Sequence, residues 1–96
     1  MARIYKYPMP EAGKPFDLKI NGFCELAHVG LDQNGVPCIW AIVMPEKPEE
    51  TWTYLVLTTG EEFDTTEWCF IRSFQQGSSL GLLTWHLFRP VGQWKQ

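Results

Sequence analysis

Residues 24–44 read CELAHVGLDQNGVPCIWAIVM, and this stretch decides the fold. Two runs rich in apolar and β-branched residues flank the dipeptide Asn34-Gly35. Asn-Gly tolerates the positive φ angles that a two-residue hairpin turn requires. The pattern therefore predicts two antiparallel strands over residues 24–33 and 36–44, joined at this dipeptide.

A two-residue loop also fixes which residues face one another across the predicted hairpin. In that register Leu31 faces Cys38 and Val29 faces Trp40. The second strand is apolar on both faces. Such a strand is typically central in its sheet, or it carries a ligand or a subunit contact on one face.

Short runs of strand-forming residues, bounded by proline, glycine and asparagine, continue on both sides of the hairpin. They predict further strands over residues 3–7, 16–20, 51–58, 68–74 and 80–89. The polar connection over residues 59–66 has room for one short helical turn. We therefore expect one all-β domain over residues 1–96, with about seven strands and at most one short helix, as a partial barrel or a two-layer sandwich.

The composition of the chain argues against duplex nucleic-acid binding and against a membrane span. The chain has 96 residues, a formal net charge of −3 and eight Lys and Arg residues that are spread singly. Duplex nucleic acid needs several phosphates neutralised by clustered cations, so we expect no duplex binding. No apolar run reaches about 18 residues, which predicts no membrane span. Three cysteines without a secretory leader predict reduced thiols in a cytoplasm.

The cysteines and histidines match no metal-binding spacing. Cys24 and His28 would share a strand face, but their Cα atoms would lie about 13 Å apart at ~3.3 Å per residue. We therefore expect no metal and no cofactor. The better interpretation of Cys24, Cys38 and Cys69 is small buried side chains, although the sequence leaves open whether one of them is reactive.

One arrangement resembles the minimum for thiol catalysis. Cys69 and His86 would face each other if the last hairpin turned at Gly77-Ser78. However, Cys69 lies inside a predicted strand between two aromatic residues, where a thiolate is not stabilised. No phosphate loop, dinucleotide fingerprint or nucleophile elbow occurs. We expect a protein that is not an enzyme, with a small thiol or carboxylate hydrolase as an alternative.

Aromatic residues make up 15% of the chain, more than one small core can hold. Rings left exposed beside a cation can stack on a nucleobase while the cation neutralises a phosphate. On this basis we predict Tyr5, Tyr7 and Trp52 as stacking groups, and Lys6 and Arg72 as phosphate contacts.

The sequence also resembles a family of small uncharacterised proteins from bacteriophages and prophages. Three segments carry the resemblance: IYKYP at residues 4–8, QNGVPCIWA at residues 33–41 and WHLF at residues 85–88. The resemblance covers nearly the whole chain and implies a phage origin, with the cytoplasm of an infected bacterium as its location. It implies no catalytic residues.

Together these observations predict a non-enzymatic phage accessory protein that counters host defence by binding. The leading hypothesis is sequestration of a nucleotide-type immune signal in a pocket shared between subunits of a homo-oligomer. The alternative is an anti-CRISPR-like inhibitor that covers a host defence protein with the acidic residues 46–50 and 61–64. A structural virion or assembly protein is a further alternative.

Overall fold

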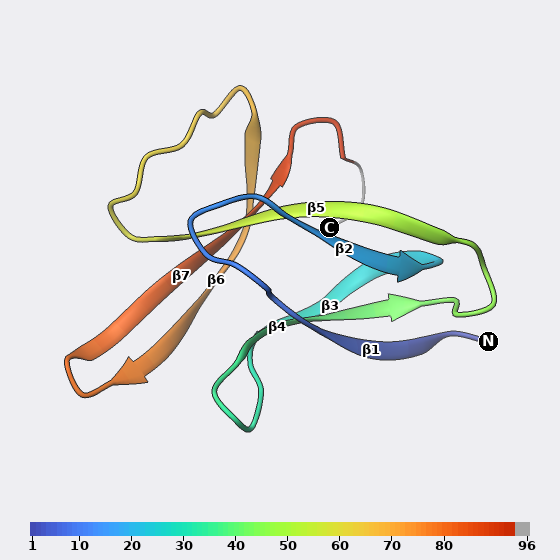
Figure 1. Cartoon of the computed structure of the whole chain (residues 1–96), viewed down its shortest axis with the longest axis horizontal. Helices are drawn as coiled ribbons and strands as arrows, with labels where there is room; N and C mark the ends of the chain where they lie inside the picture. The colour runs from blue at the N-terminus through green and yellow to red at the C-terminus, as the bar shows by residue number, and fades with distance from the viewer. Residues whose placement is uncertain (94–96) are drawn as a thin grey trace.

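The computed structural model describes residues 1–93 and forms an all-β sandwich (Figure 1). No helix occurs within these residues. The seven strands are β1 (Arg3–Pro8), β2 (Phe16–Asn21), β3 (Phe23–Leu31), β4 (Pro37–Val43), β5 (Glu49–Thr58), β6 (Trp68–Ser78) and β7 (Gly81–Pro90). All pairings are antiparallel, in a three-stranded sheet of order β1-β4-β3 and a four-stranded sheet of order β2-β5-β7-β6.

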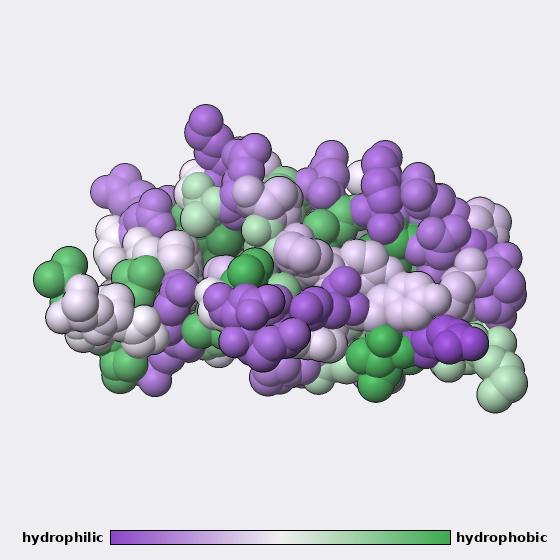
Figure 2. Space-filling model, turned by 60° about the horizontal axis from the view of Figure 1, so that its bottom comes forward, coloured by the Kyte–Doolittle hydropathy of each residue, from purple (hydrophilic) through white to green (hydrophobic). Residues whose placement is uncertain are grey.

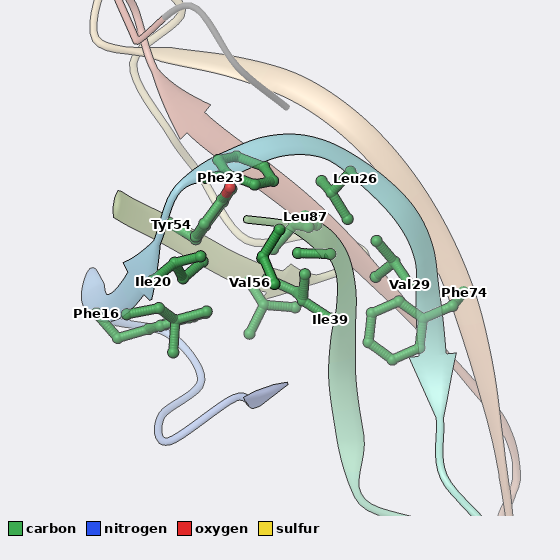
Figure 3. Close-up of a cluster of buried hydrophobic side chains, with 13 residues drawn as sticks. Phe16, Ile20, Phe23, Leu26, Val29, Ile39, Tyr54, Val56, Phe74 and Leu87 are labelled. Atoms are coloured by element: carbon green, nitrogen blue, oxygen red, sulfur yellow. The ribbon is translucent and has the colours of Figure 1, made fainter. Parts of the chain in front are cut away.

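The two sheets pack face to face around one main core (Figure 3). Side chains alternate between buried and exposed along β2, so that Phe16, Leu18 and Ile20 all point into this core. The same cluster takes Ile39 from β4 and Leu87 from β7. The sheets do not close into a barrel. Of the two architectures that the sequence allowed, the molecule therefore adopts the sandwich.

The register predicted for the β3–β4 hairpin is wrong by one residue. Val29 pairs with Ile39 and His28 pairs with Trp40, and β-bulges shift the pairing further toward the start of β3. Asn34 lacks the positive φ that the predicted turn requires, because among the described residues only glycines have positive φ. The connection is instead longer than two residues.

Asp32 is the cause of the longer loop. Its carboxylate accepts hydrogen bonds from the backbone N–H groups of Val36 (3.0 Å) and Asn34 (2.8 Å). An aspartate side chain that accepts hydrogen bonds from the backbone N–H groups that follow it stabilises a longer turn in place of the tight hairpin turn. The same carboxylate forms an ion pair with Lys6 at 3.1 Å, which ties the loop to β1.

These contacts predict an acid-sensitive hairpin. The Val36 and Asn34 N–H groups and the Lys6 ammonium hold the pKa of Asp32 below its usual 3.8. A lowered folded-state pKa contributes stability above the unfolded-state pKa, and that stability is lost as pH falls through the folded-state pKa. Asp32→Asn should therefore be less stable than the wild type at neutral pH and should lose less stability on acidification. Urea unfolding at a series of pH values measures both effects, and parallel stability curves for the two proteins would contradict the prediction.

The turn of the last hairpin is centred at Ser79-Leu80, two residues further along the chain than Gly77-Ser78. Ser78 pairs with Gly81 across the turn, so Cys69 pairs with Arg89 rather than with His86. The Cys69–His86 pair, which depended on a turn at Gly77-Ser78, therefore does not form. The sequence signal for this turn was weak, because glycine and serine residues flank its true centre on both sides.

The connection over residues 59–67 contains turns at residues 59–60 and 65–67, and no helix forms where a short one was allowed. The Asp64 carboxylate accepts hydrogen bonds from the Thr66 backbone N–H (2.8 Å) and the Thr66 hydroxyl (2.6 Å). The Asp64 carbonyl then accepts from the N–H groups of Glu67 and Trp68. Asp64 thus caps one turn, and β6 begins at Trp68.

Tyr54 carries a buried hydroxyl that has no hydrogen-bond partner within residues 1–93. Burial raises the pKa of Tyr54 above its usual value of 10.0, and the nearby Arg89 opposes that shift. A raised folded-state pKa means that stability is fully present below the unfolded-state pKa of about 10 and is lost as pH rises above it.

We expect Tyr54→Phe to raise the free energy of unfolding by about 1 kcal/mol, because an unpaired buried polar group is removed. The variant should also lose less stability than the wild type at alkaline pH. Chemical unfolding near neutral and alkaline pH tests both points, with Tyr5→Phe as the control at a half-exposed tyrosine. A variant that is clearly less stable than the wild type would show that the hydroxyl is paired in solution.

Candidate functional site

The five residues predicted to bind a ligand lie on three strands of two different sheets. Tyr5, Lys6 and Tyr7 lie on β1, at an edge of the three-stranded sheet, whereas Trp52 lies on β5 and Arg72 on β6. Tyr7 and Trp52 pack against the main core. Lys6 is engaged in the ion pair described above. None of the five lines any of the three cavities described below.

A different site forms on the outer face of the four-stranded sheet. Leu55, Leu57 and Phe88 form a second buried cluster there, on the side away from the main core. The connection after β5 places Phe63 against this cluster, with its ring centroid 4.4 Å from that of Phe88. A sheet that is apolar on both faces is stable when other parts of the chain cover both faces. Here the loop that carries Phe63 covers only part of the outer face.

Beside this loop lies a cavity of about 310 Å³, which we call the outer cavity. Its volume is at the lower end of the range typical of small-molecule sites, about 300–1,000 Å³. Phe88 contacts two other rings that line it, those of Phe63 and Phe70. Phe70 is 56% exposed and Phe63 is 42% exposed, so both present ring surface to an incoming group. The lining residues are Leu57, Thr58, Thr59, Gly60, Glu61, Phe63, Phe70, His86 and Phe88.

His86 gives the outer cavity a polar group in a fixed orientation. Its Nδ1 lies 2.7 Å from the Ser73 hydroxyl, across the β6–β7 ladder, and its Nε2 lies 2.8 Å from the Thr59 hydroxyl. A hydroxyl can donate or accept, so these contacts satisfy either tautomer of the ring. A ligand that reaches the cavity meets an imidazole and a threonine hydroxyl that can rearrange to match its own donors and acceptors.

Glu61 is the acidic residue in the lining. Its carboxylate accepts hydrogen bonds from the Thr58 N–H (2.6 Å) and the Thr58 hydroxyl (2.9 Å), and these bonds lower the pKa of Glu61. The carboxylate is therefore ionised at neutral pH, and no Lys or Arg is among the nine lining residues. The cavity consequently favours an uncharged ring and disfavours a phosphate group inside it.

Arg72 is the predicted ligand residue that lies on the same strand as Phe70 of the outer cavity. It pairs with Leu87, whose side chain lies in the main core, so Arg72 lies on the opposite face of β6 from Phe70 and Ser73. The strand bulges at this point, and the Arg72 side chain is exposed. Because β6 is the edge strand of its sheet, a guanidinium here would have to reach round that edge to meet the charged part of a ligand whose ring occupies the cavity.

Two further cavities have only one aromatic residue each among their lining residues. One of about 300 Å³ lies where Gly22 meets the β4–β5 connection, and Cys24, Met44 and Lys47 are among its lining residues. The other, of about 130 Å³, lies beside Met9. Neither brings several aromatic rings together, so the outer cavity is the stronger candidate.

The three thiols differ in how far they are exposed. Within residues 1–93 no group of three or more His, Cys, Asp and Glu side chains could hold a metal ion. Cys38 is buried, and burial raises the pKa of its thiol. Cys24 is exposed and Cys69 is half-buried, so the expectation that all three cysteines are buried is wrong for these two.

The sequence contained one signal for the outer cavity. In β7, Trp85 and Leu87 face the main core, while His86 and Phe88 alternate with them on the opposite face. Such a strand has two apolar faces, which predicts a second cluster. Phe63 gave no comparable signal, because it lies in a loop whose neighbours are acidic and polar.

Comparison with known proteins identifies a family without assigning an activity. A family model described as "Domain of unknown function (DUF7352)" matches residues 1–96, so the chain belongs to that family. A search of curated proteins gave no match, and neither did a search of solved structures. Over residues 1–93, the fold contains no helix long and apolar enough to cross a membrane.

Proposed function

We propose that this member of the DUF7352 family is a small non-enzymatic binding protein that holds the flat ring of a nucleotide-type ligand in the outer cavity. The observation that carries the proposal is the outer cavity itself, in which two half-exposed phenylalanine rings flank the buried ring of Phe88. Stacking of a base on an aromatic side chain contributes about 1–3 kcal/mol per base.

The polar groups of the cavity support a ring with hydrogen-bonding edges. Thr59 and His86 line the cavity and already exchange a hydrogen bond with each other. A heterocycle can replace that bond with bonds to its own ring nitrogens or carbonyl oxygens, whereas a hydrocarbon ring would leave these groups unpaired. A nucleobase is therefore a better occupant than a purely apolar ring.

The same geometry favours holding the ligand over converting it. In hydrolytic triads a buried carboxylate orients the histidine and stabilises the imidazolium that forms during proton transfer. Here both ring nitrogens of His86 contact hydroxyls, those of Ser73 and Thr59. Hydroxyls orient the ring but provide no negative charge, and the carboxylate of Glu61 in the lining bonds Thr58 and not His86.

In this proposal the phosphate of the ligand stays outside the cavity, near Arg72. The proposal keeps Arg72 from the sequence prediction and replaces Tyr5, Tyr7 and Trp52 with the phenylalanines of the outer cavity. Its biological role would be that of a phage accessory protein, which sequesters a nucleotide immune signal in the cytoplasm of an infected host and so counters host defence.

Arg72→Gln tests the phosphate contact. Because an exposed ion pair contributes only about 0.2–1 kcal/mol, we expect a loss of roughly 2- to 5-fold in affinity for a nucleoside monophosphate. The affinity for the corresponding nucleoside should not change. Titration calorimetry with both ligands measures the difference, and equal losses for the two would place the phosphate away from Arg72.

A second candidate function is inhibition of a host defence protein through surface contacts. The β6–β7 turn projects from the body of the molecule and carries Leu80, which is 98% exposed, and Leu82, which is 71% exposed. Hydrophobic residues gather at the left end in Figure 2, the end that bears this turn in Figure 1. Such exposed leucines are more typical of a contact surface than of a free loop.

The acidic version of that inhibitor is less well supported. Glu46 forms an ion pair with the N-terminal amino group, and the carboxylates of Glu61 and Asp64 bond to their own loops. These groups therefore already have partners within the chain. A surface inhibitor would lose its partner on Leu80→Asp and retain it on Phe70→Ala, whereas a ligand-binding protein would lose its ligand on Phe70→Ala.

A further inference from the structure

The β6–β7 hairpin exposes apolar side chains at both of its ends on one face. Leu82 alternates in phase with His86 and Phe88 along β7, so it lies on the face that bears the outer cavity. Leu80 lies in the turn beside it. At the opposite end of the hairpin, Phe70 pairs with Phe88. One end thus presents leucine side chains, and the other presents an aromatic hollow.

The part of this face between the two ends is polar but carries no acidic or strongly basic side chain. Gln75 pairs with Thr84, and Ser73 pairs with His86. Directly paired residues share a face, so these four side chains fill the middle of the outer face. The chain has a net charge of −3, which opposes self-association in general. This face is an exception, because two copies could meet here without bringing like charges together.

The spacing along β7 matches a two-fold arrangement. Thr84 is the midpoint between Leu80 and Phe88, and also between Leu82 and His86. If two copies stack with their hairpins antiparallel about an axis at Thr84, each turn reaches the other copy's outer cavity. Such an interface is isologous, so that every contact occurs twice.

We propose that a second copy of this chain completes the outer cavity, with the partner's Leu80 lying against the half-exposed rings of Phe63 and Phe70 beside Phe88 and the partner's Leu82 lying over His86. The contact removes the exposed leucines from water and covers the open side of the cavity. This interface does not depend on the proposed function. The further consequence, that the partner encloses a bound ligand, does rest on it.

The size of the contact predicts its strength. The hairpin face is two strands wide, at about 4.8 Å between strands, and about 26 Å long from Leu80 to Phe88 at ~3.3 Å per residue. This gives a flat area of roughly 250 Å² per chain, well below the ~800 Å² per partner of a standard stable interface. The dimer should therefore be weak without ligand, and a ligand enclosed between the two copies should tighten it by linkage.

Sedimentation equilibrium of the wild type, without ligand, over about 10 μM to 1 mM tests the dimer in the range expected for a weak interface. We expect reversible association to a dimer that is abolished in the double variant Leu80→Asp/Leu82→Asp. Ile4→Asp is the matched control, because Ile4 is 62% exposed but lies on the other sheet. Thermal unfolding of each variant confirms folding. A monomeric wild type at ~1 mM, or association lost only in the Ile4 variant, would overturn the proposal.

Cross-linking tests the position of the axis. In a chain that carries Cys24→Ser and Cys69→Ser, a cysteine introduced by Thr84→Cys should join two copies through a bismaleimide about 10 Å long, the usual spacing of packed sheets. Thr51→Cys on β5 should not. Failure of the Thr84 position to cross-link, with a wild type that dimerises, would place the interface elsewhere. Because no ligand is present in either experiment, their outcome is independent of whether the outer cavity binds a nucleotide.

Discussion

Gly22→Ala is expected to lower the free energy of unfolding by about 3 kcal/mol or more, because two costs add at this position. Gly22 has a φ of +60°, a left-handed conformation that costs other residues about 1–2 kcal/mol. In addition, a Cβ atom there would fall on the carbonyl oxygen of Met44 and within 2.9 Å of the Cβ atom of Lys47. The Met44 N–H donates to the Gly22 carbonyl at 2.8 Å, so the two segments cannot separate without losing this bond.

Gly35→Ala is the matched control for the steric part of this prediction. Gly35 has a φ of +77°, but a Cβ atom added there would meet nothing within 4 Å. The free energy of unfolding of the control should therefore fall only by the cost of the left-handed conformation, about 1–2 kcal/mol. Urea unfolding of the two variants gives the comparison. Equal losses would show that the contact between the β2–β3 turn and the β4–β5 connection is looser than described.

Phe70→Ala is expected to weaken binding of a nucleotide-type ligand by roughly 10- to 100-fold, the equivalent of one lost stacking contact of about 1–3 kcal/mol. Phe70 is 56% exposed, so the fold should tolerate the change. Titration calorimetry with a ligand that binds the wild type measures the loss, and circular dichroism verifies the fold.

Tyr5→Ala is the control that separates the two possible sites. Tyr5 is an aromatic side chain of similar exposure, 43%, but it lies on β1 in the other sheet. We expect it to leave ligand affinity unchanged. If Tyr5→Ala abolishes binding while Phe70→Ala does not, the ligand site is the one predicted from the sequence and not the outer cavity.

The all-β architecture was predictable because each strand carries its own local signal. Residues 16–20 alternate between buried and exposed side chains as their sequence predicts, and asparagine, glycine and proline mark the strand ends. The hairpin register was not predictable from Asn34-Gly35 alone. The outcome depended on Asp32, which bonds the following backbone and lengthens the loop.

The site was predictable only in part, because it is assembled from distant segments. The surplus of aromatic residues pointed correctly to exposed rings, whereas the phosphate contact at Arg72 stays a prediction. Phe63, Phe70 and His86 come from a loop and two strands, and only the fold brings them together. The observed turn at Ser79-Leu80, rather than at Gly77-Ser78, decides that His86 faces Ser73 and not Cys69.

The most direct test of the central claim is native mass spectrometry of the purified protein, with and without a panel of linear and cyclic nucleotides. We predict a fixed mass increment for at least one nucleotide. The increment should be reversible on denaturation, with the nucleotide recovered chemically unchanged, and it should be reduced by Phe70→Ala. Protein that stays free of every nucleotide in the panel, or that returns a nucleotide chemically altered, would contradict the account.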